Sequence, residues 1–294
     1  MCPVGVIFPE VCFCMTKNNI DEDIVLADFT VLLSVYQKES PLYLSQALDS
    51  IWYKQDLKPS QIVLVKDGPL TSELNAEIEI WCKRLGEVLT CVTLPSNVGL
   101  AAALNIGLEH CNFDLVARMD TDDVSLPERF KLQVSFMNAN VNVAVSSGFI
   151  EEWNLDLSTQ MSSRRLPLAH DDIVSFAKLR SPISHPAAIF RKSVILGVGG
   201  YYNIYPEDHL LWVRVIQSGY KLANIPEFLL KMRTGEAFVT RRGYTFLKGE
   251  LASYRLMYKS DFLSFCELVK VSFLRSVVRL SPSFMKIFMY KKMR

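Results

Sequence analysis

The sequence has almost no excess of charge of either sign. Its 294 residues include 32 Lys and Arg against 31 Asp and Glu, which leaves a formal net charge of +1. Proteins that bind nucleic acid through its phosphates are usually far more basic. We therefore exclude nucleic acid as a partner.

Long apolar runs are missing as well. No stretch of about 18 uncharged apolar residues occurs, so no membrane-spanning helix is expected. The apolar N-terminus (residues 1–15) lacks a basic start and carries Pro3, Pro9 and Glu10, which argues against a signal peptide. We interpret residues 1–28 as an N-terminal extension before the first strand.

The sequence also lacks paired cysteines and glycine-rich phosphate loops. Its seven cysteines include no C-x-x-C pair, which argues against a disulfide framework and a zinc site and favours a reducing compartment. No G-x-G-x-x-G follows the first predicted strand, and no G-x-x-x-x-G-K-[ST] occurs. Dinucleotide-binding and P-loop proteins are therefore excluded.

Apolar segments that are present alternate with helical patterns. Half of the residues are hydrophobic, enough for a large core. We predict buried strands at 29–36, 61–68, 89–95 and 115–120, with a helix after each of the first three; Ser40 is expected to cap the first helix. Later segments predict a strand at 143–149, a helix near His170 and two short strands on either side of Pro226. This alternation predicts an α/β fold with a mostly parallel central sheet covered on both faces.

Polar residues follow the ends of these strands. Glu39, Asp67, Asn97 and the acidic group 120–123 each come directly after a predicted strand. Ligands of such sheets bind beyond the carboxyl ends of the strands. We therefore expect these side chains to converge on one edge of the sheet.

Asp120 and Asp122 are candidate metal ligands. Carboxylates this close repel one another unless a cation neutralises them, and in an extended segment residues i and i+2 point the same way. Mn²⁺ or Mg²⁺ binds carboxylate and phosphate oxygens together. The alternative is a solvated acidic turn before the next helix.

Five other residues are candidates for the site, and four of them also have a structural interpretation. Asp67 can accept the imide N–H of uracil or stabilise a turn, and Asn97 precedes a helix start suited to phosphate or sugar oxygens. Glu207 and Asp208 begin a helix, where acids favour the helix dipole but where one of them can also act as a general base. His185, in a Ser-His-Pro sequence, can contact a diphosphate or metal, or be a hydrogen-bonded structural residue.

The residues with this chemistry lie in segments that follow one another in a fixed order. These segments are FTVLLSVYQKE, IVLVKDG, NVGLAAALNIG, ARMDTDD, SHPAAIFRKSV, GGY and EDHLLWVRVIQSGYKLANIPEFLLKMR. Together they resemble family 2 of the nucleotide-sugar glycosyltransferases, over about residues 29–233. Among its members the chain looks most similar to bacterial enzymes that extend N-acetylhexosamine-diphosphate-undecaprenol in O-antigen synthesis.

The resemblance implies an A-type glycosyltransferase (Rossmann-like) fold, a UDP-sugar donor, a divalent metal and inversion at the anomeric carbon. Asp120 and Asp122 then match the metal and ribose/diphosphate carboxylates, Asp67 the uracil contact, and Asp208, with Glu207 beside it, the base. Residues 29–150 would bind the nucleotide sugar, and residues 151–235 would bind the acceptor and supply the base. The Gln-x-x-Arg-Trp motif of processive members is not found.

The implied function is transfer of a hexose from a UDP-sugar to GlcNAc-diphosphate-undecaprenol, with a β-1,3 linkage. Galactose is favoured and glucose is the alternative. A nucleotidyltransferase would need a glycine-rich basic loop where VYQKESP stands. A non-catalytic, membrane-attached sugar-nucleotide binding protein would keep the fold but would not need Glu207 and Asp208.

The C-terminal region (236–294) differs in composition. From Leu268 onward, apolar residues at roughly helical spacing alternate with the cations Lys270, Arg275, Arg279, Lys286, Lys291, Lys292 and Arg294, and the pair Arg241 and Arg242 precedes them. Such a helical segment can lie on an anionic membrane surface, with Arg241 and Arg242 near the lipid diphosphate. This interpretation predicts a peripheral protein on the cytoplasmic face of the inner membrane. The alternative is a helix pair packed on the body with a solvated basic face.

Overall fold

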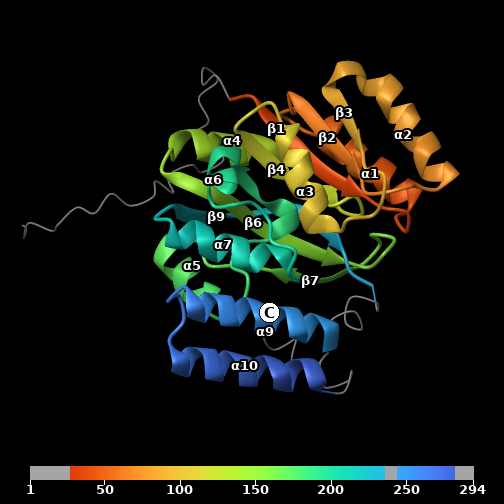
Figure 1. Cartoon of the computed structure of the whole chain (residues 1–294). Helices are drawn as coiled ribbons and strands as arrows, with labels where there is room; N and C mark the ends of the chain where they lie inside the picture. The colour runs from red at the N-terminus through yellow and green to blue at the C-terminus, as the bar shows by residue number, and fades with distance from the viewer. Residues whose placement is uncertain (1–26, 236–243, 282–294) are drawn as a thin grey trace, which may run out of the picture.

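One nine-stranded sheet forms the centre of the molecule (Figure 1). The computed structural model describes residues 27–235 and 244–281. Four neighbouring strands run parallel in the order β3-β2-β1-β4. Their bounds are β1 Phe29–Val35, β2 Gln61–Lys66, β3 Leu89–Thr93 and β4 Leu115–Arg118.

The second half of the chain extends this sheet from β4. The order continues β8-β6-β9-β5, with β8 antiparallel to both neighbours, β9 parallel to β6, and β7 paired to the far part of β6. The bounds are β5 Val124–Ser125, β6 Val143–Trp153, β7 Gln160–Arg164, β8 Ile189–Arg191 and β9 Lys221–Arg233.

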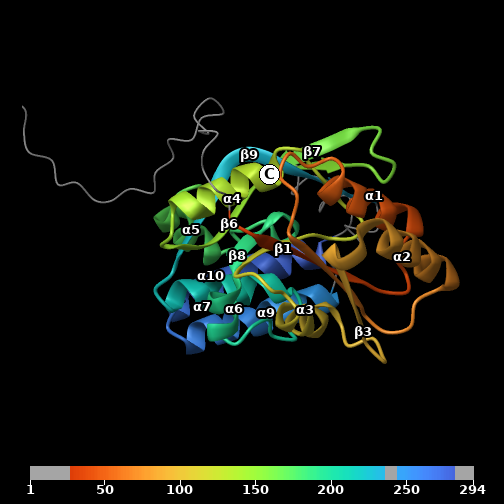
Figure 2. The ribbon, with the colours of Figure 1, turned by 90° about the horizontal axis from the view of Figure 1, so that it is seen from above.

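Helices cover both faces of the sheet (Figure 2). On one face lie α1 (Pro41–Trp52), α2 (Ser72–Leu85) and α4 (Arg129–Ala139). On the other lie α3 (Leu100–Glu109), α6 (Lys192–Gly197) and α7 (Glu207–Gln217), and α5 (His170–Ala177) packs beside α7. The strands are continuously apolar because both their faces are buried: Val31 and Leu33 of β1 face the first set, and Leu32 faces the second.

A helical hairpin forms a third layer outside α7. It consists of α9 (Tyr244–Lys259) and α10 (Phe265–Leu280), and Figure 1 shows α10 outermost. Leu210 and Val213 of α7 pack against Tyr254 and Met257 of α9. We call α9 and α10 the C-terminal hairpin.

The predicted α/β class with a mainly parallel sheet and helices toward the C-terminus is confirmed. The prediction of two short strands around Pro226 is wrong, because β9 is one strand. The register with β6 jumps from the pair Gly148–Ile225 to the pair Phe149–Phe228, so Pro226 lies in a bulge, where its missing N–H breaks no ladder bond. Ser40 precedes α1 as expected, but its side chain makes no capping hydrogen bond.

The C-terminal helices pack on the body, as the alternative interpretation expected, but of the three cations of α10 only Lys270 is exposed. Arg275 and Arg279 are buried, 6% and 4% exposed, whereas Phe265, Val269 and Phe273 are 64%, 52% and 72% exposed. The arginines therefore face the protein and an apolar stripe faces outward. Within the described residues, no helix has the length and hydropathy needed to cross a bilayer.

Candidate active site

The five residues predicted at the strand ends line one cavity of about 290 Å³. We call it the strand-end cavity; its predicted residues are Glu39, Asp67, Asn97, Asp120 and Asp122. It forms because β1, β2 and β4 run parallel and end at the same edge. The convergence expected from the fold is what the structure has.

Three carboxylates form a group beside this cavity. Asp120, Asp122 and Asp123 each offer an oxygen within 4.8 Å of the other two. Asp120 and Asp122 come together on a turn after β4, not through the extended segment we predicted. Arg118, fully buried, forms an ion pair with Asp120 at 2.5 Å, and the backbone N–H of Arg233 donates to Asp123 at 2.9 Å.

Electrostatic repulsion within this group favours a bound cation. Burial, and then the charge of Asp120, raises the pKa of Asp122 to about 6. Burial raises the pKa of Asp123 well above its usual value, and Asp122 adds to that effect. Hard oxygen ligands of this kind suit Mn²⁺ or Mg²⁺, so the donor set fits the predicted metal.

Asp67 holds the loop between β3 and α3. Its carboxylate accepts the N–H of Val98 at 2.7 Å and of Gly99 at 3.1 Å, and Asn97 Nδ2 donates to it at 3.0 Å. The loop N–H groups of Val98 and Gly99, which we expected to face a phosphate, therefore donate their hydrogen bonds to Asp67. Asp67 and Asn97 both line the strand-end cavity, and the hydrogen bond between them fixes this part of its wall.

A second cavity, of about 340 Å³, lies at the start of α7. We call it the α7 cavity, and the predicted residues Glu207, Asp208 and His185 line it. Asp120 lines both cavities, so they adjoin at this carboxylate. Residues 120 and 207–208, far apart in the chain, are thereby brought to one place.

Glu207 and His185 are buried side by side. Glu207 Oε1 lies 3.8 Å from His185 Nδ1, and the side chains are 11% and 9% exposed. Burial, and then Asp208, raises the pKa of Glu207 to about 7, whereas burial lowers the pKa of His185 well below its usual range. His185 is therefore neutral near pH 7. Its Nε2 lies 3.0 Å from the Tyr201 hydroxyl, which fits the structural interpretation, and it is not part of the carboxylate group.

Asp208 is oriented by a hydrogen bond from a neighbouring segment. Ser181 Oγ donates to Asp208 Oδ2 at 2.7 Å. Asp208 also lies in the first turn of α7, where the helix dipole favours a negative charge. The carboxylate is thus fixed in one orientation at the cavity wall.

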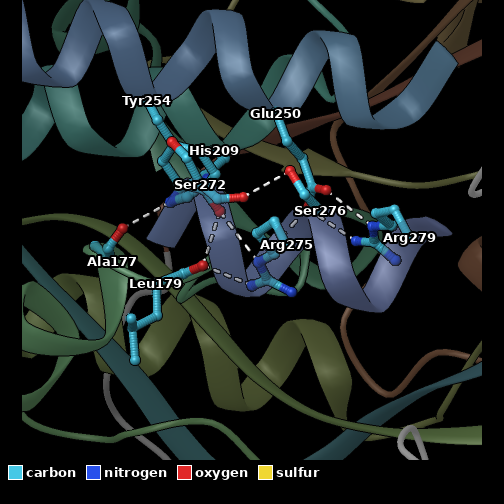
Figure 3. Close-up of polar contacts among 9 residues, drawn as sticks. All are labelled: Ala177, Leu179, His209, Glu250, Tyr254, Ser272, Arg275, Ser276 and Arg279. Atoms are coloured by element: carbon cyan, nitrogen blue, oxygen red, sulfur yellow. Dashed lines mark hydrogen bonds and ion pairs between the residues drawn. The ribbon is translucent and has the colours of Figure 1, made fainter. Parts of the chain in front are cut away.

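The C-terminal hairpin in turn holds the segment that carries Ser181 (Figure 3). The Leu179 carbonyl accepts from Tyr254 Oη at 2.8 Å and from Arg275 Nη2 at 2.5 Å. Glu250 accepts from Arg279 Nε and Nη2, both at 2.8 Å. A contact chain therefore runs from α10 through Leu179 and Ser181 to Asp208.

Sequence reasoning missed several residues of the two cavities. Arg118, Ser181 and the cavity residues Arg164, Arg165 and Arg180 were not predicted. Arg118 directly precedes Met119 and Asp120 in the ARMD segment, which is a usable signal; Ser181 has none, because its role depends on long-range packing. The predicted residues Arg241 and Arg242 lie outside the described part of the chain.

Solved structures with a similar fold define the fold class. A Pyrobaculum calidifontis mannosyltransferase in complex with GDP-Man and Mn²⁺ matches with a TM-score of 0.61 and 16% identity, covering 85% of this chain and 69% of that one. S. aureus TarS in complex with UDP-GlcNAc matches with a TM-score of 0.62 and 18% identity, covering 86% and 74%. The fold is therefore that of the A-type glycosyltransferases, as predicted.

The sequence pattern of glycosyl transferase family 2 matches residues 30–196. The chain belongs to this family and is a glycosyltransferase. It is 39% identical over 268 residues to the amylovoran biosynthesis glycosyltransferase AmsE of Erwinia amylovora, covering 90% of this chain and 99% of the relative. It is 36% identical over 266 residues to an Escherichia coli UDP-Gal:alpha-D-GlcNAc-diphosphoundecaprenol beta-1,3-galactosyltransferase, covering 90% and 95%.

Proposed function

We propose that this protein transfers a hexose, with inversion, from a UDP-sugar to GlcNAc-diphosphate-undecaprenol, forming a β-1,3 linkage in O-antigen or related polysaccharide synthesis. The observation that supports it most is the meeting of the two cavities at Asp120. Asp120 and Asp122, which suit a metal, line the strand-end cavity, and the pair Glu207 and Asp208 lines the α7 cavity. The similarity to the E. coli galactosyltransferase supports galactose as the sugar, with glucose as the alternative.

In this proposal residues 29–150 bind the donor. Asp120 and Asp122 would hold Mn²⁺ or Mg²⁺, which when bound neutralises charge on the departing UDP. Asp67, Asn97 and Glu39 line the strand-end cavity in which the nucleotide would lie. The Asp67–Asn97 contacts keep the loop of residues 97–99 in place for it.

Residues 151–235 supply the acceptor side and the base. Asp208 removes the proton from the acceptor hydroxyl as that oxygen attacks the anomeric carbon, and the hydrogen bond from Ser181 keeps its carboxylate aimed. Glu207, buried beside His185, is the second carboxylate of the pair. Its raised pKa makes it the alternative base.

The first test is a donor screen combined with a substitution. UDP-Gal and UDP-Glc are offered with a synthetic GlcNAc-diphosphate-lipid, with Mn²⁺ present or chelated. We expect transfer from UDP-Gal, its loss on chelation, and a loss of about 10²–10⁴-fold in Asp208→Asn with UDP–Mn²⁺ binding retained. Equal activity of Asp208→Asn contradicts its role as base, and binding without turnover of any donor indicates a non-catalytic protein.

The acceptor's lipid requires a membrane-facing surface, which we propose is the outer stripe of α10. Phe265, Val269, Phe273 and Val277 recur every four residues, and each is at least 45% exposed. The hairpin also contributes Phe246 and Glu250 to the α7 cavity, so a bilayer against α10 lies next to the proposed acceptor site. The protein would then bind peripherally to the anionic cytoplasmic face of the inner membrane.

Phe273→Glu tests this surface without the unfolding that truncation of α10 risks. It should reduce co-flotation with vesicles containing phosphatidylglycerol by severalfold, because it places a charge in the apolar stripe. Val141→Glu, on a residue 78% exposed between α4 and β6, is the matched control. Equal flotation of wild type and Phe273→Glu excludes α10 as the membrane contact.

A further inference from the structure

Two cysteine side chains meet at the β3 edge of the central sheet. Cys82, in the last turn of α2, and Cys91, in the middle of β3, have their sulfur atoms 3.5 Å apart. Among the described strands, β3 is the first in the sheet order and pairs only with β2. Cys91 is exposed and Cys82 is half-buried, so a small molecule in solvent can reach the pair.

The other described cysteines differ from these two. Cys111 is buried, and its thiol donates to the Gly107 carbonyl at 3.3 Å. Cys266, on α10, is exposed. Within residues 27–235 and 244–281, neither has a second thiol in hydrogen-bonding contact. A neighbouring thiol, and not exposure alone, therefore distinguishes the pair at the sheet edge.

The two thiols of this pair are not equivalent. Although part of Cys91 is open to solvent, the burial of its sulfur, and then the hydrogen bond with Cys82, raises the pKa of its thiol to about 12. The positive charge of Lys66, on β2, acts in the opposite direction. Cys91 therefore keeps its proton near pH 7. Because thiols react as thiolates, the first attack on an oxidant falls to Cys82.

We propose that Cys82 and Cys91 are a site of reversible oxidation, at which a small disulfide of the glutathione type converts the two thiols into an intramolecular disulfide. Cys82 Sγ attacks one sulfur of the small disulfide, whose S–S bond breaks, and one small thiol leaves with the Cys82 proton. Cys91 Sγ then attacks Cys82 Sγ in the mixed disulfide, and the second small thiol leaves with the Cys91 proton. The protein sulfurs are oxidised and the small disulfide is reduced to two thiols. An excess of small thiol reverses both steps.

The bond requires little movement of the chain. A disulfide holds its sulfurs about 2.05 Å apart, and rotation about the two Cα–Cβ bonds can supply the approach from 3.5 Å. The loop that the bond closes is short, because only the turn Gly86–Val88 separates α2 from β3 apart from the ends of these elements. The second thiol is thus always close to the mixed disulfide, which favours ring closure over attack by a further small thiol.

The oxidation site is separate from both cavities. Neither cysteine lines the strand-end cavity or the α7 cavity. The bond would join the end of α2 to β3, where Leu85 and Leu89 already belong to one core cluster. It should therefore stabilise the fold by restricting the unfolded chain, and leave the donor cavity open. In a reducing compartment the pair remains a dithiol, and it becomes cross-linked when the compartment turns oxidising.

Peptide mapping of the full chain detects the bond directly. The protein is incubated with equal amounts of reduced and oxidised glutathione, free thiols are alkylated, and tryptic peptides are analysed by mass spectrometry. Cleavage after Lys83 and Arg84 places Cys82 and Cys91 in different peptides, which only a cross-link keeps together. We expect most of the wild-type chain to carry this link and dithiothreitol to remove it. Because Cys111 lies in the same tryptic peptide as Cys91, loss of the link in Cys91→Ser assigns the bond.

Variants and stability measurements complete the test. Cys91→Ser should trap glutathione on Cys82 as a mixed disulfide, whereas Cys266→Ser, which removes an exposed thiol elsewhere, should leave the cross-link unchanged. Oxidised wild type should melt about 5 °C above the reduced protein, and oxidised Cys91→Ser should not. The affinity for UDP and Mn²⁺ should not change on oxidation. A wild-type chain in which Cys82 ends as a glutathione mixed disulfide, or a cross-link that persists in Cys91→Ser, overturns the inference.

Discussion

Glu207 shows how strongly one residue's chemistry depends on its surroundings. Its side chain is 11% exposed, and burial followed by the charge of Asp208 raises its pKa from 4.5 to about 7. The folded protein therefore binds this proton more tightly than the unfolded chain does. Stability that is fully present below about pH 4.5 is lost as the pH rises through about 7.

Glu207→Gln should remove this pH dependence. We expect wild type to lose more free energy of unfolding between pH 5 and pH 8 than the variant, by an amount on the order of 2–3 kcal/mol. Urea unfolding in EDTA, at both pH values, measures the difference while keeping metals away from the carboxylate group. Parallel pH profiles for the two proteins would show that Glu207 titrates normally.

At this scale the sequence indicated which residues gather but not what they contact. Glu39, Asp67, Asn97 and Asp120 were predictable because each follows a strand and parallel strands end together. The hydrogen bonds of Asp67 to the 97–99 loop were not predictable, because they depend on the path of a connection. Ser181 was missed for the same reason.

The contact between α9 and the segment before α7 decides how these two elements fit together. A Cβ on Gly249 would lie 1.5 Å from the carbonyl oxygen of Tyr205, two residues before Glu207. Only glycine allows α9 to approach the backbone this closely. The start of α7 is therefore set partly by a helix that follows it in the sequence.

Gly249→Ala should push α9 away from Tyr205. Overpacking of this kind costs about 1–3 kcal/mol, so we expect a lower melting temperature together with reduced transfer activity. Gly197→Ala, at the end of α6, has no atom within 4 Å of the added Cβ and serves as the control. Differential scanning calorimetry of the three proteins decides; a Gly249→Ala protein as stable as wild type would contradict the close packing.

Helices and strands were predictable where the spacing of apolar residues agreed with the positions of the residues that begin or end an element. The strands 29–36 and 61–68 and the helix ending at Gly86 were found in this way. Pro226 misled the prediction, because proline usually ends a strand and here occupies a bulge within one. Which face of α10 points outward was left open by the sequence, because arginine is usually exposed and the burial of Arg279 depends on Glu250, which lies on another helix.

Across the whole molecule, Glu250 links the two helices of the outer layer. It lies 2.8 Å from Arg279 and 3.8 Å from Arg275, and all three side chains are at most 7% exposed. Removing one partner of a buried ion pair leaves uncompensated charge, at a cost of about 3–5 kcal/mol. An exposed pair contributes about 0–1 kcal/mol.

Glu250→Ala should therefore destabilise the protein far more than Lys178→Ala does. Lys178 pairs with Glu267 of α10 at 2.7 Å, and both side chains are 37% exposed. Chemical denaturation gives both values, and near-ultraviolet circular dichroism reports whether the hairpin stays docked. Similar losses in the two variants would mean that the buried pair contributes no more than the surface one.

The docking of the C-terminal hairpin on α7 bears on how the hairpin can be exchanged between relatives. A chimera joined at residue 236 would set a foreign α9 and α10 against Leu210 and Val213, which pack on the native hairpin. The transplantable unit instead has to include the outward positions of α7, although they precede the junction. A unit that can be exchanged between relatives therefore follows the packing of the folded protein and not a single point along the chain.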